Sequence, residues 1–269
     1  MKPNVPLYAK IRNLCREIEK EEDITILFAV ENGSRAWRME SANSDYDVRF
    51  VYHHPLEKYI SLKKPKDVID KFYSKDCMKC TQEEALIDAV GFDIFKYLDL
   101  LVKSNPTAIE WLTTDIVYYG EQNKVFRKFA LDNLNKIALV YHYKSLCKQN
   151  YIKHLKSGAH LSYKKYLYSL RGLVNAKFVA QFSSMPLISF TEAVKQISMP
   201  EYIKNKCLEI IELKRKGKEK EIITNIKHFD DYIDNFLKEE VLIKEKPSKG
   251  DIGIIDKEIR KLLIDNKAR

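Results

Sequence analysis

Two aspartates separated by one residue, Asp45 and Asp47, open an apolar run shortly after a Gly33-Ser34 pair. Side chains alternate along a strand, so carboxylates spaced in this way point to one face, about 6–7 Å apart. Such oxygens can converge on divalent cations and favour Mg²⁺ or Mn²⁺. Of two bound metals, one activates an attacking oxygen and the other stabilises a leaving pyrophosphate. The spacing predicts a site that holds metal against a nucleoside triphosphate (NTP); the alternative is an ordinary turn with Asp47 facing solvent.

Two strands and a turn must position these residues. The apolar, β-branched run Ile24–Val30 reads as a buried strand, and Tyr46–Tyr52 reads as the next one. Gly33 supplies the backbone freedom for a tight turn between them. Residues Ser34–Met39 can then form a short helix with Ser34 as its N-cap, and a helix N-terminus is a natural seat for phosphate.

The pattern resembles the DNA polymerase β-like nucleotidyltransferase superfamily, in which Gly-Gly or Gly-Ser precedes Asp-apolar-Asp or Asp-apolar-Glu by about ten residues. Tyr46 departs from the apolar middle position. The longer pattern is similar to the RNA repair pathway DNA polymerase β family. The matching segments, which span roughly residues 24–180, are Gly33-Ser34-Arg35-Ala36-Trp37, Glu40-Ser41, Ser44-Asp45-Tyr46-Asp47-Val48-Arg49-Phe50, Gly91-Phe92-Asp93, Lys103-Ser104-Asn105-Pro106, Glu110-Trp111-Leu112 and Lys164-Lys165-Tyr166-Leu167-Tyr168-Ser169-Leu170-Arg171.

The resemblance implies transfer of a nucleoside monophosphate from an NTP to an acceptor hydroxyl or phosphate, and a third carboxylate on a neighbouring strand. Asp88 is the favoured candidate because it lies within the apolar run Leu86–Val90. There it would ligate metal or accept the proton of the nucleophile. Asp93 fits better as the N-cap of a helix over Ile94–Ser104. Asp67 and Asp70 are weaker alternatives.

The superfamily often turns a helical region after the catalytic sheet toward the triphosphate. Lys164, Tyr168 and Arg171 recur at i, i+4 and i+7 and so share one helix face, with Lys165 beside it. We assign these four residues, together with Gly33, Ser34 and Arg35 of the turn, to nucleotide binding. A plain amphipathic helix is the alternative for the four later residues.

The positive charge is concentrated in one stretch. The chain has 47 Lys and Arg against 38 Asp and Glu, a formal net charge of +9. Residues 133–191 contain no Asp or Glu but nine Lys and Arg, interleaved with tyrosines. A basic surface with aromatic side chains suits phosphate contact and base stacking, so the stretch predicts RNA as a partner, and the alternative is a solvated basic helix face.

Composition sets the remaining expectations. With 269 residues we expect two domains, a polymerase β-like nucleotidyltransferase domain over 1–120 and a helical domain over 121–269. The expected fold class is α+β, a small sheet with flanking helices followed by a helical bundle. The sequence has no run of 18 apolar residues and no signal-peptide core near Met1, so no membrane association is expected.

Five scattered cysteines argue against a disulfide framework and favour a reducing cytoplasm. Cys77 and Cys80 form a single CxxC pair, and a zinc site would need four ligands, so free thiols are favoured. Outside the sheet, the helices that we expect are Pro6–Lys20, Ile94–Ser104, Thr107–Leu112, Val125–Leu139, Tyr141–Leu155, Tyr163–Phe182, Thr191–Ile197, Glu201–Lys216, Glu219–Lys238 and Ile255–Leu263.

The function predicted from these features is metal-dependent transfer of a nucleoside monophosphate to RNA, with Mg²⁺ or Mn²⁺ as cofactor. The same chemistry on a protein hydroxyl or a small molecule is one alternative. A non-catalytic RNA- or nucleotide-binding protein of the same fold is another, although Ser34, Asp45 and Asp47 count against it.

Overall fold

The computed structural model describes residues 5–156, 160–240 and 250–264, and these form a mixed α+β fold. Five strands make one sheet in the order β3-β4-β2-β1-β5. Strands β2 and β4 run parallel, and every other neighbouring pair is antiparallel. The strands are β1 (Thr25–Asn32), β2 (Tyr46–His53), β3 (Val68–Tyr73), β4 (Ile87–Asp93) and β5 (Val117–Gly120).

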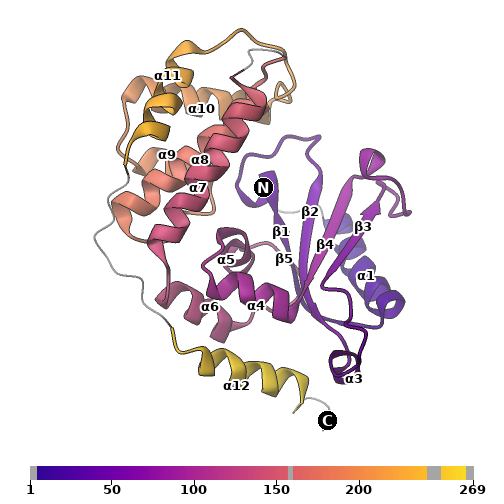
Figure 1. Ribbon diagram of the computed structural model, residues 1–269. Helices are drawn as coiled ribbons and strands as arrows, with labels where there is room; N and C mark the ends of the chain where they lie inside the picture. Colours follow the sequence, from indigo (N-terminus) through magenta and orange to yellow (C-terminus); the bar gives the residue numbers. More distant parts are fainter. Residues whose placement is uncertain (1–4, 157–159, 241–249, 265–269) are drawn as a thin grey trace.

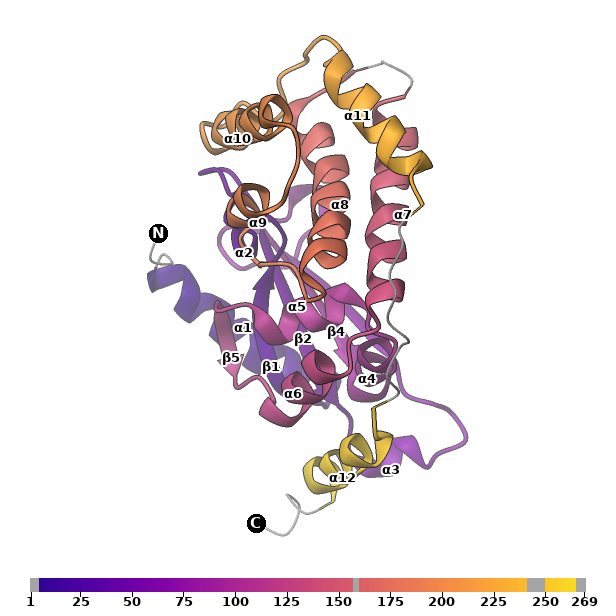
Figure 2. The ribbon, with the colours of Figure 1, turned by 90° about the vertical axis from the view of Figure 1, so that its left-hand side faces the viewer.

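The helices lie on both faces of the sheet and in a separate bundle above it (Figures 1 and 2). Those that accompany the sheet are α1 (Val5–Glu22), α2 (Gly33–Ala36), α3 (Leu56–Tyr59), η1 (Gln82–Glu84), α4 (Ile94–Val102), α5 (Pro106–Thr113), α6 (Lys124–Asp132) and α12 (Ile252–Leu263). The bundle contains α7 (Lys136–His154), α8 (Tyr163–Phe182), α9 (Phe190–Gln196), α10 (Glu201–Arg215) and α11 (Lys227–Lys238).

Alternation along the strands gives each face of the sheet its own apolar core. Val48, Phe50 and Tyr52 of β2 pack in one cluster with the buried stripe of α1. Val51 points the other way and packs with Phe28 of β1 in a cluster formed largely by α4, α5 and α6. Asp47 and Arg49 alternate with Val48, Phe50 and Tyr52, so they lie on the same face as Val51. This is the face that the bundle approaches.

A third apolar core fills the bundle and is built mainly from α7–α11. Phe126 and Phe129 of α6 and Ile255 of α12 do not join it, because they pack with Trp111 against the sheet. The apolar contacts of residues 124–132 and 252–263 thus place these two segments with the sheet. The predicted domain boundary between residues 120 and 121 assigns both of them to the helical domain. Trp111 is buried in this core, as its apolar neighbours predict.

Some elements differ from the sequence-based expectations. Strand β5 was not predicted, because four residues at a sheet edge carry little periodicity. The helix expected over 125–139 is interrupted, since Asn135 caps a new helix by accepting a hydrogen bond from the Ala138 amide. Helix α11 starts at Lys227 rather than at Glu219, because Ile222 and Ile223 bond instead to the segment before α8.

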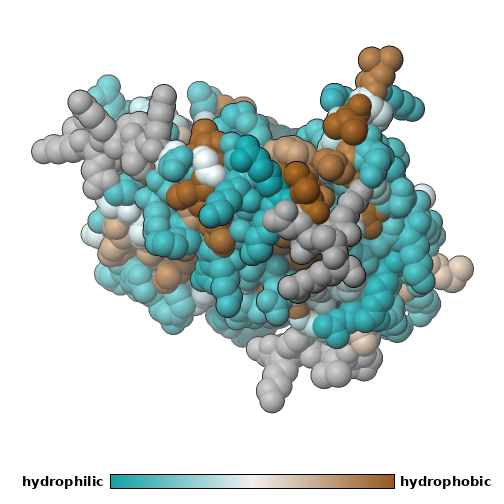
Figure 3. Space-filling model, turned by 90° about the horizontal axis from the view of Figure 1, so that it is seen from below, coloured by the Kyte–Doolittle hydropathy of each residue, from teal (hydrophilic) through white to brown (hydrophobic). Residues whose placement is uncertain are grey.

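The face of the molecule seen from below in Figure 3 is mostly hydrophilic, with apolar side chains in separate groups. Among the helices of the described ranges, none is long and apolar enough to span a bilayer.

Candidate active site

The parallel pairing of β2 with β4 brings two of the predicted carboxylates side by side. Asp47 and Asp88 are direct register partners. Neighbouring strands lie about 4.8 Å apart and paired residues point to the same face. Their side chains keep partial access to solvent, at 30% and 28% exposed. Two acidic groups from strands far apart in sequence therefore share one edge of the bundle-facing surface.

The turn before β2 is shaped around Asp47. Gly33 adopts φ +63°, and a Cβ built on it would lie 1.8 Å from Oδ2 of Asp47. Only glycine permits both this backbone conformation and this approach. Asn32 rather than Ser34 precedes helix α2, and its side chain makes no capping bond, so the expected N-cap at Ser34 is wrong. Ser34 lies inside the short helix.

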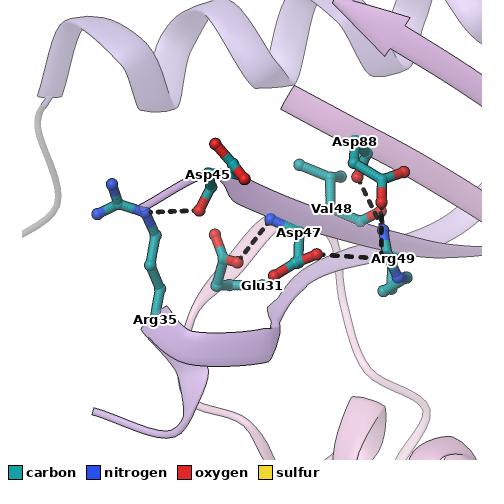
Figure 4. A network of polar contacts seen from close by, with 7 residues as sticks. All are labelled: Glu31, Arg35, Asp45, Asp47, Val48, Arg49 and Asp88. Atoms are coloured by element: carbon teal, nitrogen blue, oxygen red, sulfur yellow. Dashed lines mark hydrogen bonds and ion pairs between the residues drawn. The ribbon is translucent and has the colours of Figure 1, made fainter. Parts of the chain in front are cut away.

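Arg49 lies between the two carboxylates (Figure 4). Its Nη2 donates to Asp47 Oδ1 and to Asp88 Oδ2, each at 3.1 Å. Its Nη1 donates to the carbonyl oxygens of Val48 at 3.0 Å and Asp88 at 2.8 Å. The guanidinium uses one oxygen of each carboxylate. Oδ1 of Asp88 is buried and has no hydrogen-bond partner among the described residues. No role for Arg49 was predicted, although its i+2 spacing from Asp47 places it on the same face.

Glu31 supports the site from β1. Its Oε1 accepts a hydrogen bond from the Asp47 backbone amide at 2.9 Å, and its Oε2 accepts one from the Tyr118 hydroxyl. Burial, with a smaller contribution from the charge of Asp47, raises the pKa of Glu31 to about 8. Glu31 is therefore mainly neutral near pH 7, which limits the negative charge beside Asp47.

Burial is also the main cause that raises the pKa of Asp47. The negative charges of Asp88 and Asp45 raise it further, whereas the positive charges of Arg49 and Lys164 lower it. Burial thus outweighs the effect of Arg49, and the charges of Asp88 and Asp45 act in the same direction as burial.

Asp45 does not follow the predicted alternation. Strand β2 begins at Tyr46, so Asp45 lies outside the pleat, and its carbonyl oxygen accepts a hydrogen bond from Arg35 Nε at 3.0 Å. In Figure 4 the carboxylates of Asp45 and Asp47 point in different directions. As the side chains are placed, no three His, Cys, Asp or Glu residues of the described segments lie close enough together to hold a metal ion.

The alternative third carboxylates lie elsewhere. Asp93 caps α4 by accepting from the Phe95 amide at 3.0 Å, and it also accepts from the Tyr59 hydroxyl. It pairs with the far end of β2, five residues or about 16 Å along the strand from Asp88. Asp67 bonds Lys96 near that same end. Asp70 is exposed on β3. Of these candidates, the register brings Asp88 alone opposite Asp47.

A small recess lies between α2 and the bundle, with a cavity volume of about 10 Å³. Trp37 and Tyr168 form an edge-to-face aromatic pair in its wall, with ring centroids 6.5 Å apart. The positive charge of Lys164 acts to lower the pKa of Asp47. Lys214, which forms an ion pair with Glu219, also lies in the recess wall. Lys214 was not predicted, because α10 is distant in sequence. The lining residues are Ser34, Trp37, Met39, Lys164, Leu167, Tyr168 and Lys214.

The other predicted nucleotide-binding residues make different contacts. Arg35 donates to the carbonyls of Ser44 and Asp45, and its guanidinium lies 3.8 Å from the centre of the Tyr46 ring. Lys165 donates to the His160 carbonyl at 2.7 Å. Arg171 is buried and does not line the recess. On the predicted helix face, Lys164 and Tyr168 therefore line the recess, whereas Arg171 is buried.

The thiols of all five cysteines are free. Cys77 and Cys80 lie in the turn after β3 and are partly buried. No second cluster of metal-binding residues accompanies them in the part of the chain that the structure covers.

Comparison with known proteins adds three findings. A model of the RNA repair pathway DNA polymerase beta family matches residues 8–265. The chain is 31% identical over 261 residues to the uncharacterized protein YcgL of Bacillus subtilis (strain 168), covering 95% of each chain. A nucleotidyltransferase-like protein from Exiguobacterium sibiricum 255-15 aligns with a TM-score of 0.30 and 13% identity, over 96% of this chain and 77% of that one.

Proposed function

Because the chain belongs to the RNA repair pathway DNA polymerase beta family, we propose that it transfers a nucleoside monophosphate from an NTP to RNA. The observation that carries the proposal is the pairing of Asp47 with Asp88 beside the Gly33 turn. Acidic residues on adjacent strands, next to a turn and a lysine-lined recess, suit phosphoryl-group chemistry, in which positioning and charge stabilisation supply most of the catalysis.

The residues fit a divalent cation. Within the described segments, Asp88 Oδ1 is a buried acceptor without a donor, and Asp47, whose pKa is raised mainly by burial, lies beside it. Oxygen ligands of this kind favour Mg²⁺ or Mn²⁺. When bound, the metal would lower the pKa of the acceptor hydroxyl and offset charge on the leaving pyrophosphate. Asp47 and Asp88 would hold it, and Asp45 would join by rotating its exposed side chain.

The remaining residues would bind and orient the substrate. Ser34 can donate its hydroxyl to a phosphate oxygen at the recess, where Lys164 contributes positive charge. Tyr168 and Trp37 offer aromatic surface beside them. In the described part of the chain, Arg35 and Lys165 donate hydrogen bonds to neutral carbonyl oxygens, so their charges stay available to the polyphosphate or the acceptor.

RNA is the proposed acceptor because of the acid-free stretch 133–191. Lys148, Lys153 and Lys156 of this stretch are exposed on or just after α7, and Tyr141 on the same helix is 57% exposed. Cations with exposed aromatic rings favour a nucleic acid strand over a small neutral acceptor. The free thiols of the five cysteines suit work in a reducing cytoplasm.

Substitution of Asp47 tests the proposal. Asp47→Asn preserves the size of the side chain but removes a metal-binding charge, so we expect transfer of labelled nucleotide to RNA to fall by about 10²–10⁴-fold. Circular dichroism should show an unchanged fold. Purified protein with Mg²⁺ or Mn²⁺ should be assayed with each of the four NTPs. Failure to label RNA with any of them would contradict the proposed activity.

A further inference from the structure

A buried carboxylate on α5 connects the sheet half to the bundle. Glu110 accepts hydrogen bonds from Trp37 Nε1 at 3.1 Å, from Arg171 Nη2 at 2.5 Å and from the Tyr143 hydroxyl at 3.4 Å. The donors come from the end of α2, from α8 and from α7. Glu110 and Arg171 are each only 7% exposed. A buried charge pair is weak evidence of added stability, and in some proteins its role is to fix one arrangement.

The ion pair determines how Trp37 lies. The Arg171 guanidinium stacks on the indole, 3.5 Å from the ring centre, while Glu110 holds the indole N–H. One face and one edge of the ring are thus fixed by the two members of a single ion pair. A lysine could keep the charge, but it could not stack and donate in one plane as arginine does.

Trp37 also closes the backbone turn that begins at Gly33. Its amide donates to the Gly33 carbonyl at 3.0 Å, and the next turn is closed by the Met39 amide on the Ser34 carbonyl at 2.9 Å. Trp37 and Ser34 line the same recess. A shift of the indole would therefore move the backbone that faces the proposed nucleotide phosphates and that contacts Asp47 through Gly33.

We propose that Arg171 and Glu110 are positioning residues, which act together through Trp37 to set the Gly33–Trp37 turn for the nucleotide. The inference rests on the proposed function, and it replaces direct nucleotide contact as the role of Arg171. Arg171 lies on α8 of the bundle, whereas Glu110 and Trp37 belong to the sheet half, so the ion pair couples the position of Trp37 to the bundle. Their loss should affect nucleotide binding although neither side chain reaches the recess.

The test uses Arg171→Met, Glu110→Gln and the double variant, each in a Trp111→Phe background that leaves Trp37 as the only tryptophan. Leu173→Ala is the matched control, because Leu173 is buried on α8 but belongs to the bundle core. ATP with Mg²⁺ is the probe. We measure the emission of Trp37 without ligand, the ATP dependence of that emission, and KM and kcat for transfer.

Both single variants should shift the emission of Trp37 to longer wavelength and raise KM for ATP at least tenfold, with a smaller change in kcat. The double variant should resemble either single variant, because the pair acts as one unit. Arg171→Lys should recover only part of the effect. Leu173→Ala should lower thermal stability and leave KM within twofold of the parent.

Three results would overturn the inference: unchanged Trp37 emission in folded Arg171→Met, effects of the two single variants that add in the double variant, or equal KM changes in the control. If only Arg171→Met raised KM, with normal emission, direct contact with the nucleotide would replace positioning. A parent protein that neither binds ATP nor transfers nucleotide would contradict the proposed function. The ligand-free emission would still decide whether the ion pair positions Trp37.

Discussion

Replacing Gly33 by alanine should separate the geometry of the site from the stability of the fold. Gly33 has φ +63°, and an added Cβ would lie 1.8 Å from Asp47 Oδ2 and 2.6 Å from its Cγ. Real Cβ atoms essentially never approach a neighbour within 3.0 Å, so the carboxylate and the turn must move apart by more than 1 Å. A displacement of about 1 Å at reacting groups can reduce catalysis by about 10²-fold.

The chain contains a matched control for the backbone contribution. Gly217 has φ +81°, and a Cβ there would meet nothing within 4 Å. Alanine at a positive φ costs about 1–2 kcal/mol, so both variants should lose about that much free energy of unfolding in urea titrations. Only Gly33→Ala should also lose transfer of α-labelled nucleotide, by about 10²-fold, because only there does the methyl group displace Asp47.

The transfer rates of Gly33→Ala and Gly217→Ala separate the effect of the clash with Asp47 from the effect of lost stability. If Gly33→Ala transferred nucleotide as fast as Gly217→Ala, the close approach of the turn to Asp47 would have no part in the activity. If both variants lost transfer equally, the effect would come from stability and not from the position of the carboxylate. Far-ultraviolet circular dichroism confirms that each variant is folded before rates are compared.

Three further predictions concern the third carboxylate, the pH dependence of stability and the acceptor. Asp88→Asn should reduce transfer by about 10²–10⁴-fold, whereas Asp93→Asn should keep it, because Asn can still cap α4; equal losses would refute the assignment of Asp88. Burial raises the pKa of Asp93 above its usual value. The stability that this group contributes is therefore complete below about pH 4 and is lost as pH rises through its folded pKa, so Asp93→Asn should gain relative to wild type along that rise. Charge reversal of Lys148 and Lys153 should weaken RNA binding and flatten its salt dependence, measured by fluorescence anisotropy; affinity that is equal at low and high salt in wild type would contradict an RNA acceptor.

The local part of the fold could be predicted from the sequence. The segments of β1 and β2 were expected within two residues, and α8 spans the expected Tyr163–Phe182 because twenty residues of helical pattern carry a strong signal. Breaks such as the one before α7 were missed, since apolar residues continue across Asn133 and Asn135 and hide the new N-cap.

The candidate site was predictable only where it is local. The sequence pattern placed Asp88 in a strand, but its register opposite Asp47 depends on the parallel pairing of segments 41 residues apart. The orientation of Asp45 was predicted wrongly, because the rule of alternation applies only inside the strand, which starts one residue later. The i+2 spacing of Arg49 from Asp47 was the one signal for its place, whereas Lys214 gave none because its position in the recess is fixed by tertiary structure.

The recess between α2 and the bundle has a consequence for how the protein responds to its substrate. One wall is carried by the segment that follows β1, and the other by α8 and α10; Met39 of the first wall is itself buried in the bundle core. A polyphosphate bound there would contact residues of both walls at once, so neither half would bind it fully alone. Bound substrate would then add to the contacts that hold the two halves together. A chain cut between these halves would lose its affinity for the substrate even if each piece folded.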